Sequence, residues 1–124
     1  MTAPRSYCAV VVDDHYDTAE SLARLLVLMG CQASFVTDAR AVVAEVLVKK
    51  PHIVFLDIRM PIINGYELAE MIRKSRSQEE TKLVALTGQP VDQARSRKAG
   101  FDAHVMKPAD PALVESILKT LLPP

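Results

Sequence analysis

The sequence predicts a doubly wound α/β domain in which five parallel strands alternate with five helices. Short apolar runs of strand length recur along the chain, and a longer segment with helical spacing of apolar residues follows each one. The length of 124 residues suits one domain, and a hydrophobic content of 49% is enough for a packed core. We therefore expect residues 1–124 to form a single domain with its core between about 6 and 122.

The predicted strands are apolar on both faces, which is typical of a parallel sheet covered by helices. Four of them end at a polar residue or pair: Tyr7–Val12 before Asp13-Asp14, Ile53–Leu56 before Asp57, Leu83–Leu86 before Thr87, and Ala103–Met106 before Lys107. A weaker strand, Ala33–Val36, follows Gly30.

The segments between the strands have helical patterns with recognisable ends. They are Tyr16–Met29, a segment capped by Asp38 and reaching about Lys49, about Tyr66–Lys74, Pro90–Ala99, and a segment from Pro111 after Asp110 to near Leu122. Gly30 and Gly100 stand where glycine commonly ends a helix. Residues 75–81 are predicted to be an ordinary surface loop.

Right-handed crossovers leave few topologies for this alternation, and we predict the strand order 2-1-3-4-5. In an open parallel sheet, sites lie beyond the carboxyl ends of the strands, at the point where the strand order reverses. The polar residues that end the strands should therefore meet at one edge: Asp13, Asp14, Asp57, Thr87 and Lys107.

Composition excludes several classes of function. Fifteen acidic and fifteen basic residues give a formal net charge of zero, which offers no electrostatic reason for binding nucleic acid or a membrane surface. No apolar run has the length of a membrane span, and the start MTAPRSY does not resemble a signal peptide, so we expect a cytoplasmic protein. Cys8 and Cys31 are too few for a disulfide framework and are interpreted as buried free thiols.

The predicted cluster indicates a particular chemistry. Three converging carboxylates repel one another unless a proton or a cation joins them, and Mg²⁺ binds through one or two carboxylates while keeping several waters. Lys107 adds a fixed positive charge and Thr87 a hydroxyl, a set that suits the oxygens of a phosphoryl group on a carboxylate. Asp57, at the end of a strand, is the candidate nucleophile.

The motifs Asp13-Asp14, FLDIRMPIINGYE, ALTG and AGFDAHVMKP together resemble the receiver domain of two-component response regulators, over about residues 6–122. The resemblance implies a flavodoxin-like fold of the chemotaxis-regulator type. It also implies that a phosphohistidine of a sensor histidine kinase or histidine phosphotransfer protein donates its phosphoryl group to Asp57, with Mg²⁺ required. The domain would then be a signalling module and not an enzyme in its own right.

The resemblance assigns roles residue by residue. Asp13 and Asp14 match the acidic pair that holds Mg²⁺, with Asp14 the more direct ligand, and Asp57 and the backbone carbonyl of Arg59 complete the metal site. Thr87 matches the residue whose hydroxyl moves to a phosphoryl oxygen, and Lys107 matches the partner of the acyl phosphate. The Lys107-Pro108 bond matches one that is cis in the family.

His104, Arg59, Gln89 and a basic run each have a functional interpretation, and all but Gln89 also have a structural alternative. His104 stands where the family often has a Tyr or Phe that moves inward with the threonine, and the alternative is a half-buried histidine bound to a backbone carbonyl. Arg59 and Gln89 occupy positions that influence how long the acyl phosphate survives, and Arg59 is alternatively a solvated surface residue. The run Arg95, Arg97, Lys98 is interpreted as a solvated helix face, with a docking surface as the alternative.

Parts of this pattern are also compatible with other interpretations. Asp13-Asp14 alone could be a helix cap. A phosphatase of the haloacid-dehalogenase type is rejected because its second aspartate, two residues after the nucleophile, is replaced here by Arg59. The remaining alternative is a pseudo-receiver, a binding module on the same fold that works without phosphorylation.

The sequence leaves the architecture open between a free-standing regulator and the receiver segment of a hybrid kinase. In either case we expect phosphorylation to shift a conformational equilibrium. Thr87 and His104 would rearrange and alter the face made by the helix at 90–99, the strand at 103–106 and the last helix, where a downstream protein partner binds.

Overall fold

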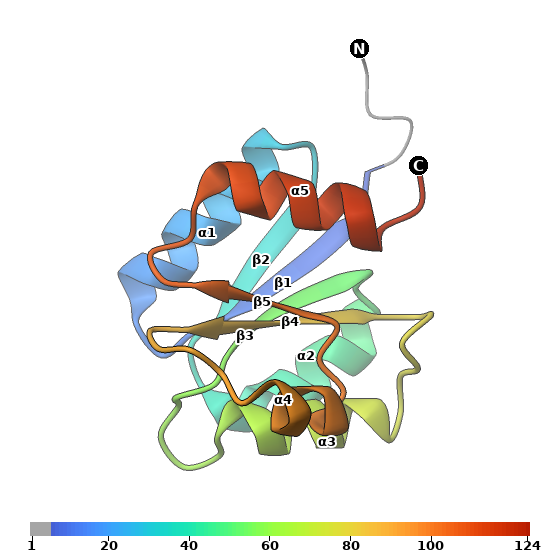
Figure 1. Ribbon diagram of the computed structural model, residues 1–124. Coiled ribbons are helices and arrows are strands. Elements are labelled where there is room, and N and C mark those ends of the chain that lie inside the picture. The colour runs from blue at the N-terminus through green and yellow to red at the C-terminus, as the bar shows by residue number, and fades with distance from the viewer. Residues whose placement is uncertain (1–5) are drawn as a thin grey trace.

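The computed structural model describes residues 6–124. Its sheet has five parallel strands, β1 (Cys8–Val12), β2 (Gln32–Val36), β3 (Ile53–Asp57), β4 (Lys82–Thr87) and β5 (Ala103–Met106). Their order is β2-β1-β3-β4-β5, so the predicted fold class and strand order are confirmed (Figure 1). The order reverses between β1 and β3, where the register pairs Val12 with Leu56.

The helices cover both faces of the sheet. They are α1 (Tyr16–Leu28), α2 (Val42–Lys49), α3 (Gly65–Arg73), α4 (Gln93–Ala99) and α5 (Pro111–Leu121), and a 3₁₀ turn, η1 (Ala39–Ala41), precedes α2. Figure 1 shows α1 and α5 together on one face, with α2, α3 and α4 on the other. The result is a three-layer arrangement with the sheet in the middle.

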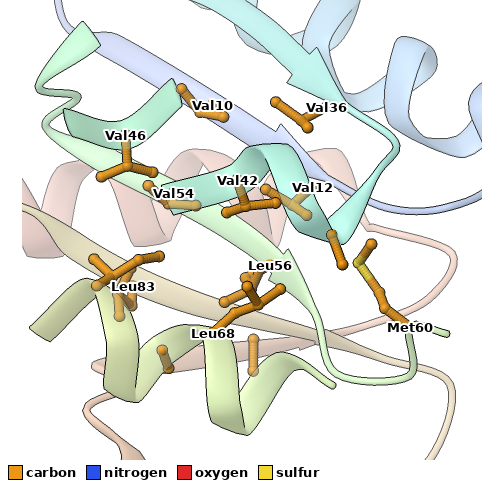
Figure 2. Packing of buried hydrophobic residues seen from close by; sticks show 14 of the residues in the cluster. Val10, Val12, Val36, Val42, Val46, Val54, Leu56, Met60, Leu68 and Leu83 are labelled. Atoms are coloured by element: carbon orange, nitrogen blue, oxygen red, sulfur yellow. The ribbon is translucent and has the colours of Figure 1, made fainter. Parts of the chain in front are cut away.

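Alternate residues of the three central strands, β1, β3 and β4, enter two separate cores. Val10, Val54 and Leu83 pack with α2 and α3 through side chains such as Val46 and Leu68 (Figure 2). The residues between them on the strands face α1 and α5, and include Val11, Phe55, Val84 and Val105. Both faces of the central strands are therefore buried, which explains why these strands are continuous apolar runs without alternation.

Local signals fix most helix ends. Gly30, just after α1, and Gly100, just after α4, have φ angles of 99° and 109°, which glycine adopts without the steric penalty of a Cβ atom. Asp110 accepts a hydrogen bond from the backbone N–H of Ala112, and Pro111 opens α5. Asn64 and Glu67 form a reciprocal capping box that starts α3.

The predicted start of the fourth helix at Pro90 is wrong. Residues 90–92 belong to the loop, and α4 begins at Gln93 because the Asp92 side chain accepts the backbone N–H of Arg95 and caps the helix. The segment predicted after Asp38 begins as the 3₁₀ turn η1, in which Asp38 accepts the N–H of Arg40.

Residues 75–81 are more than an ordinary surface loop, because the loop ends in a buried polar network. Thr81 is fully buried and its hydroxyl donates to the carbonyl of Pro51. The Arg73 guanidinium, at the end of α3, donates to the carbonyls of Gly100 and Thr81 and forms an ion pair of 2.9 Å with Asp102. This one side chain therefore joins the ends of α3 and α4 to the starts of β4 and β5.

The cysteine prediction is partly correct. Cys8 and Cys31 are both free thiols, but only Cys31 is buried, whereas Cys8 is half-buried. Burial raises the pKa of both thiols. None of the helices within residues 6–124 is long and apolar enough to cross a membrane.

Candidate functional site

Side chains from three strand ends meet at the carboxyl edge of the sheet. Asp13 follows β1, Asp57 ends β3, and Lys107 follows β5. The Lys107 Nζ atom lies 2.9 Å from Asp13 Oδ2 and 3.1 Å from Asp57 Oδ2. The convergence predicted from the strand ends is therefore present for Asp13, Asp57 and Lys107, which are up to 94 positions apart in sequence.

Asp57 is a buried carboxylate held from two sides. It is 2% exposed, its Oδ1 atom accepts the backbone N–H of Arg59 at 3.1 Å, and its Oδ2 atom contacts Lys107. Burial, together with the negative charge of Asp13, raises the pKa of Asp57 to about 6, against the lowering effect of Lys107 and of the Arg59 N–H. The pocket therefore holds more negative charge than Lys107 neutralises.

The surroundings of Lys107 favour its charged form, whereas those of Asp57 disfavour the charged carboxylate. Burial by itself would lower the pKa of the ammonium group, but hydrogen bonds to Asp13 and Asp57 outweigh it and raise the pKa above its ordinary value. Lys107 is therefore a permanent cation at the centre of this edge. The Lys107-Pro108 peptide bond is cis, as the resemblance implied.

Asp13 and Asp14 differ in exposure. The Asp13 side chain is fully buried and accepts the backbone N–H of His15, whereas the Asp14 side chain is 30% exposed and faces solvent. The residue that precedes α1 is His15, and it makes no side-chain capping bond. The interpretation of the acidic pair as a helix cap is therefore wrong.

The donor atoms at this edge fit a hard divalent cation. Carboxylate oxygens of Asp13 and Asp14, with a ring nitrogen of His15, lie within 4.8 Å of one another. Asp57 is linked to the same cluster through Lys107. An oxygen-rich set of this kind suits Mg²⁺ better than the softer metals that prefer thiolate or imidazole ligands.

Gly65 is a positioning residue whose role the sequence reasoning did not specify. It opens α3 directly behind Asp57, and its N–H donates to the carbonyl of Ile58 at 2.8 Å. A Cβ atom at Gly65 would lie 2.5 Å from the carbonyl oxygen of Asp57, so no larger residue fits without displacing the backbone beside the carboxylate. The available signal was the pair Asn64-Gly65, seven and eight residues after Asp57.

Thr87 ends β4, but its hydroxyl is bonded away from the carboxylates. It donates to the carbonyl of Gln89 at 2.6 Å and accepts the N–H of the same residue at 3.1 Å. The Gln89 side chain in turn accepts a hydrogen bond of 3.1 Å from the Arg59 guanidinium. The two residues expected to influence phosphate lifetime are thus in direct contact, and both are linked to Thr87.

His104 does not fit the half-buried alternative. It lies on β5 and is exposed, and among residues 6–124 its ring has no hydrogen-bond partner. It borders a hollow between α4 and α5 together with Arg97 and Leu113. The position is on the predicted output face, away from the cluster of carboxylates.

A model of the family described as the response regulator receiver domain matches residues 9–119. The chain belongs to this family. It is therefore a receiver domain of two-component signalling.

Curated relatives support the assignment and differ greatly in length. The chain is 28% identical over 101 residues to Protein PilG of Pseudomonas aeruginosa, covering 80% of this chain and 75% of that protein. It is 34% identical over 115 residues to the sensor histidine kinase AtsR of Burkholderia thailandensis, but the match covers 87% of this chain and only 18% of the kinase. A further relative, stress response regulator protein 1 of Clavispora lusitaniae, is 31% identical over 109 residues, and the match covers 84% of this chain and 57% of that protein.

Solved structures show the same fold. A CheY-like receiver domain protein from Methanospirillum hungatei superposes with a TM-score of 0.84 at 28% identity, covering 94% of both chains. The chemotaxis protein CheY4 of Vibrio cholerae gives a TM-score of 0.85 at 20% identity, a level that supports the fold alone.

Proposed function

We propose that this receiver domain accepts a phosphoryl group on Asp57 from the phosphohistidine of a partner protein, a sensor histidine kinase or a histidine phosphotransfer protein. The observation that carries the proposal is the position of the Asp57 side chain. It is a buried carboxylate at the end of a strand, and it contacts the Arg59 N–H and the Lys107 ammonium group. A nucleophile held on a rigid strand needs little reorganisation to reach phosphorus.

Mg²⁺ is the metal that the donor set favours. Asp13, Asp14, Asp57 and the backbone carbonyl of Arg59 would hold it, with Asp14 the most accessible carboxylate. When bound, the ion neutralises charge on the phosphoryl oxygens and on the carboxylates around them.

The residues of the chain supply the remaining parts of the transfer. A carboxylate oxygen of Asp57 forms a bond to phosphorus as the P–N bond to the donor imidazole breaks, and the electron pair of that bond stays on the imidazole nitrogen. Lys107, already beside Asp57 at 3.1 Å, pairs with the negative charge of the transferred group. The Thr87 hydroxyl leaves Gln89 and donates to a phosphoryl oxygen.

The output of the domain is a shift of a conformational equilibrium. Movement of Thr87 alters β4 and the loop to α4, and the face formed by α4, β5 and α5 changes with it. His104, exposed on β5, is the proposed second switch residue on this face. A downstream protein partner that binds one state of the face better than the other reads the signal.

Arg59 and Gln89 are proposed to influence the lifetime of the acyl phosphate. The proposal is supported by their mutual hydrogen bond and by the bonds of the Thr87 hydroxyl to the backbone of Gln89. An arginine turned toward the phosphoryl group would exclude the attacking water and lengthen the lifetime.

We further propose that residues 1–124 act as one signalling domain and not as an independent enzyme, with no nucleic-acid contact of their own. The proposed location is the cytoplasm, where thiols such as Cys8 and Cys31 stay reduced.

The test is the intact mass of the protein after incubation with acetyl phosphate, with Mg²⁺ or with a chelator. We expect the gain of one phosphoryl group only in Mg²⁺, and no gain for Asp57→Ala. The control is Glu79→Ala, since Glu79 is an exposed acidic residue of the loop at 75–81 and its removal should leave the gain unchanged.

A gain that survives Asp57→Ala would contradict the assignment of the acceptor. No gain from acetyl phosphate, and none from a panel of phosphorylated histidine phosphotransfer domains, would favour the pseudo-receiver alternative.

A further inference from the structure

A groove beside the proposed acceptor shares Thr87, Arg59 and Gln89 with the proposed site and extends beyond it to Tyr66 and Arg95, which have no role in the phosphoryl transfer described above. It lies between the loop after β3 and the loop after β4, has a volume of about 650 Å³, and is lined by residues that include Arg59, Asn64, Tyr66, Gln89 and Arg95. We call it the arginine groove. Its size is within the range of protein pockets that enclose several side chains or a small ligand.

The two arginines of the groove carry charge that no carboxylate neutralises. Among residues 6–124, neither Arg59 nor Arg95 takes part in an ion pair, although most other arginines do. One acidic residue, Asp92, also lines the groove, and its Oδ1 atom is already used to cap α4 through the N–H of Arg95. The arginine groove is therefore a concave surface with excess positive charge in a protein whose net charge is zero.

Both guanidinium groups are held in place by neutral partners. The Arg95 guanidinium lies 4.1 Å over the centre of the Tyr66 ring, and that ring packs edge-to-face against Phe101. Arg59 donates one N–H to the Gln89 side chain. A guanidinium group has five N–H donors, so each arginine keeps donors for a ligand while having lost part of its conformational freedom.

The arginine groove is also connected to the proposed switch. Thr87 bonds Gln89 through both its hydroxyl hydrogen and its hydroxyl oxygen, and Gln89 bonds Arg59. Thr87 bonds the backbone of Gln89, whereas Arg59 bonds the Gln89 side chain. If the Thr87 hydroxyl moves to a phosphoryl oxygen, the backbone of Gln89 is no longer held by Thr87, and the side chain that contacts Arg59 can move. The added phosphoryl group also attracts Arg59 and repels any carboxylate bound nearby.

We propose that the arginine groove binds an acidic side chain of a protein partner when Asp57 is unmodified, and that phosphorylation releases it. The binding site itself is argued from the two arginines, while its control by phosphorylation rests on the proposed function. Because linkage is reciprocal, a bound acidic partner would also oppose phosphorylation of Asp57.

The probe is a hexaglutamate peptide with blocked ends, titrated into the unmodified protein while the side-chain Nε–Hε signals of Arg59 and Arg95 are followed by NMR. Hexaglutamine and acetate serve as ligand controls. We expect Arg59→Gln and Arg95→Gln each to weaken binding about threefold, and the double variant about tenfold. Arg97→Gln removes the same charge from the same helix but lies outside the groove, so it should change the affinity less than about 1.5-fold.

If Arg97→Gln and Arg95→Gln weaken peptide binding equally, the peptide is attracted by general surface charge, and the proposed binding site is refuted. If acetate binds as tightly as the peptide, the groove is a site for small anions, and the proposal of a protein partner is refuted.

The second arm repeats the titration after treatment with acetyl phosphate and Mg²⁺, with phosphorylation verified by intact mass. At least threefold weaker binding to the phosphorylated protein is expected, and unchanged affinity would overturn the coupling. If the mass does not increase, the proposed phosphorylation has failed, and the arms on unmodified protein still decide whether the groove binds.

Discussion

Replacing Asp57 with asparagine should make the metal-free protein more stable at neutral pH. The substitution removes a negative charge from a pocket where Asp13 is already fully buried. Asparagine keeps an oxygen that can accept the Arg59 N–H, and Lys107 keeps its ion pair with Asp13. The folded state therefore loses electrostatic repulsion while its packing is preserved.

The size of the effect follows from the pKa of Asp57. Raising the pKa of this carboxyl group from 3.8 to about 6 corresponds to about 3 kcal/mol if the whole effect acts on the folded state. Water at the open edge of the sheet screens the charges, which reduces the expected gain to about 1–2 kcal/mol. Since the folded-state pKa is raised, the protonated carboxyl group favours folding. In the wild-type protein, the contribution of protonated Asp57 to the free energy of unfolding is therefore present below pH 4 and is lost as the pH rises through about 6.

The assay is urea unfolding of wild type and Asp57→Asn in a chelator at pH 7.5 and pH 4.5. The variant should be more stable by about 1–2 kcal/mol at pH 7.5, and by less than half of that at pH 4.5. The control is Glu79→Gln, an exposed position whose effect should stay within about 0.5 kcal/mol at both pH values. A variant less stable than wild type at pH 7.5, or a difference that does not vary with pH, would refute the electrostatic argument.

Two further substitutions test strain and burial elsewhere. Ile62 has a φ angle of 76°, inside a tight turn closed by the N–H of Ile63 and the carbonyl of Pro61, and it is 75% exposed. Ile62→Asn should therefore stabilise the protein by about 0.5–1 kcal/mol in thermal unfolding, whereas Ile62→Val should not, because valine keeps the branched Cβ. Arg73→Met leaves the carbonyls of Gly100 and Thr81 and the carboxylate of Asp102 without their cation, and should cost about 3–5 kcal/mol in urea unfolding. Arg73→Lys should recover less than half of that loss, and Lys74→Met, at an exposed neighbouring position, should have almost no effect.

The candidate site could be predicted from the sequence because its members are marked locally. Asp57, Thr87 and Lys107 each interrupt an apolar run, and the parallel sheet then brings the ends of those runs to one edge. The contact of Lys107 with Asp13 could not be predicted from any local pattern, because the two residues are 94 positions apart and follow strands, β1 and β5, that are not neighbours in the sheet. The sequence did not indicate that the Thr87 hydroxyl bonds to Gln89, because a hydroxyl rotates freely and its partner depends on the loop that follows.

The sequence by itself determined the fold class and the ends of α1 and α5, because hydrophobic spacing, capping residues and turn glycines act over a few residues. The strand order was predicted by a general rule, since right-handed crossovers leave few topologies. Only the tertiary structure decided the network around Arg73, the stacking of Arg95 on Tyr66, and the close approach of Gly65 to Asp57. These contacts join elements that are distant in sequence, and they depend on how far each helix is rotated and shifted against the sheet. That placement is set by the packing of both cores at once, which no local stretch of residues encodes.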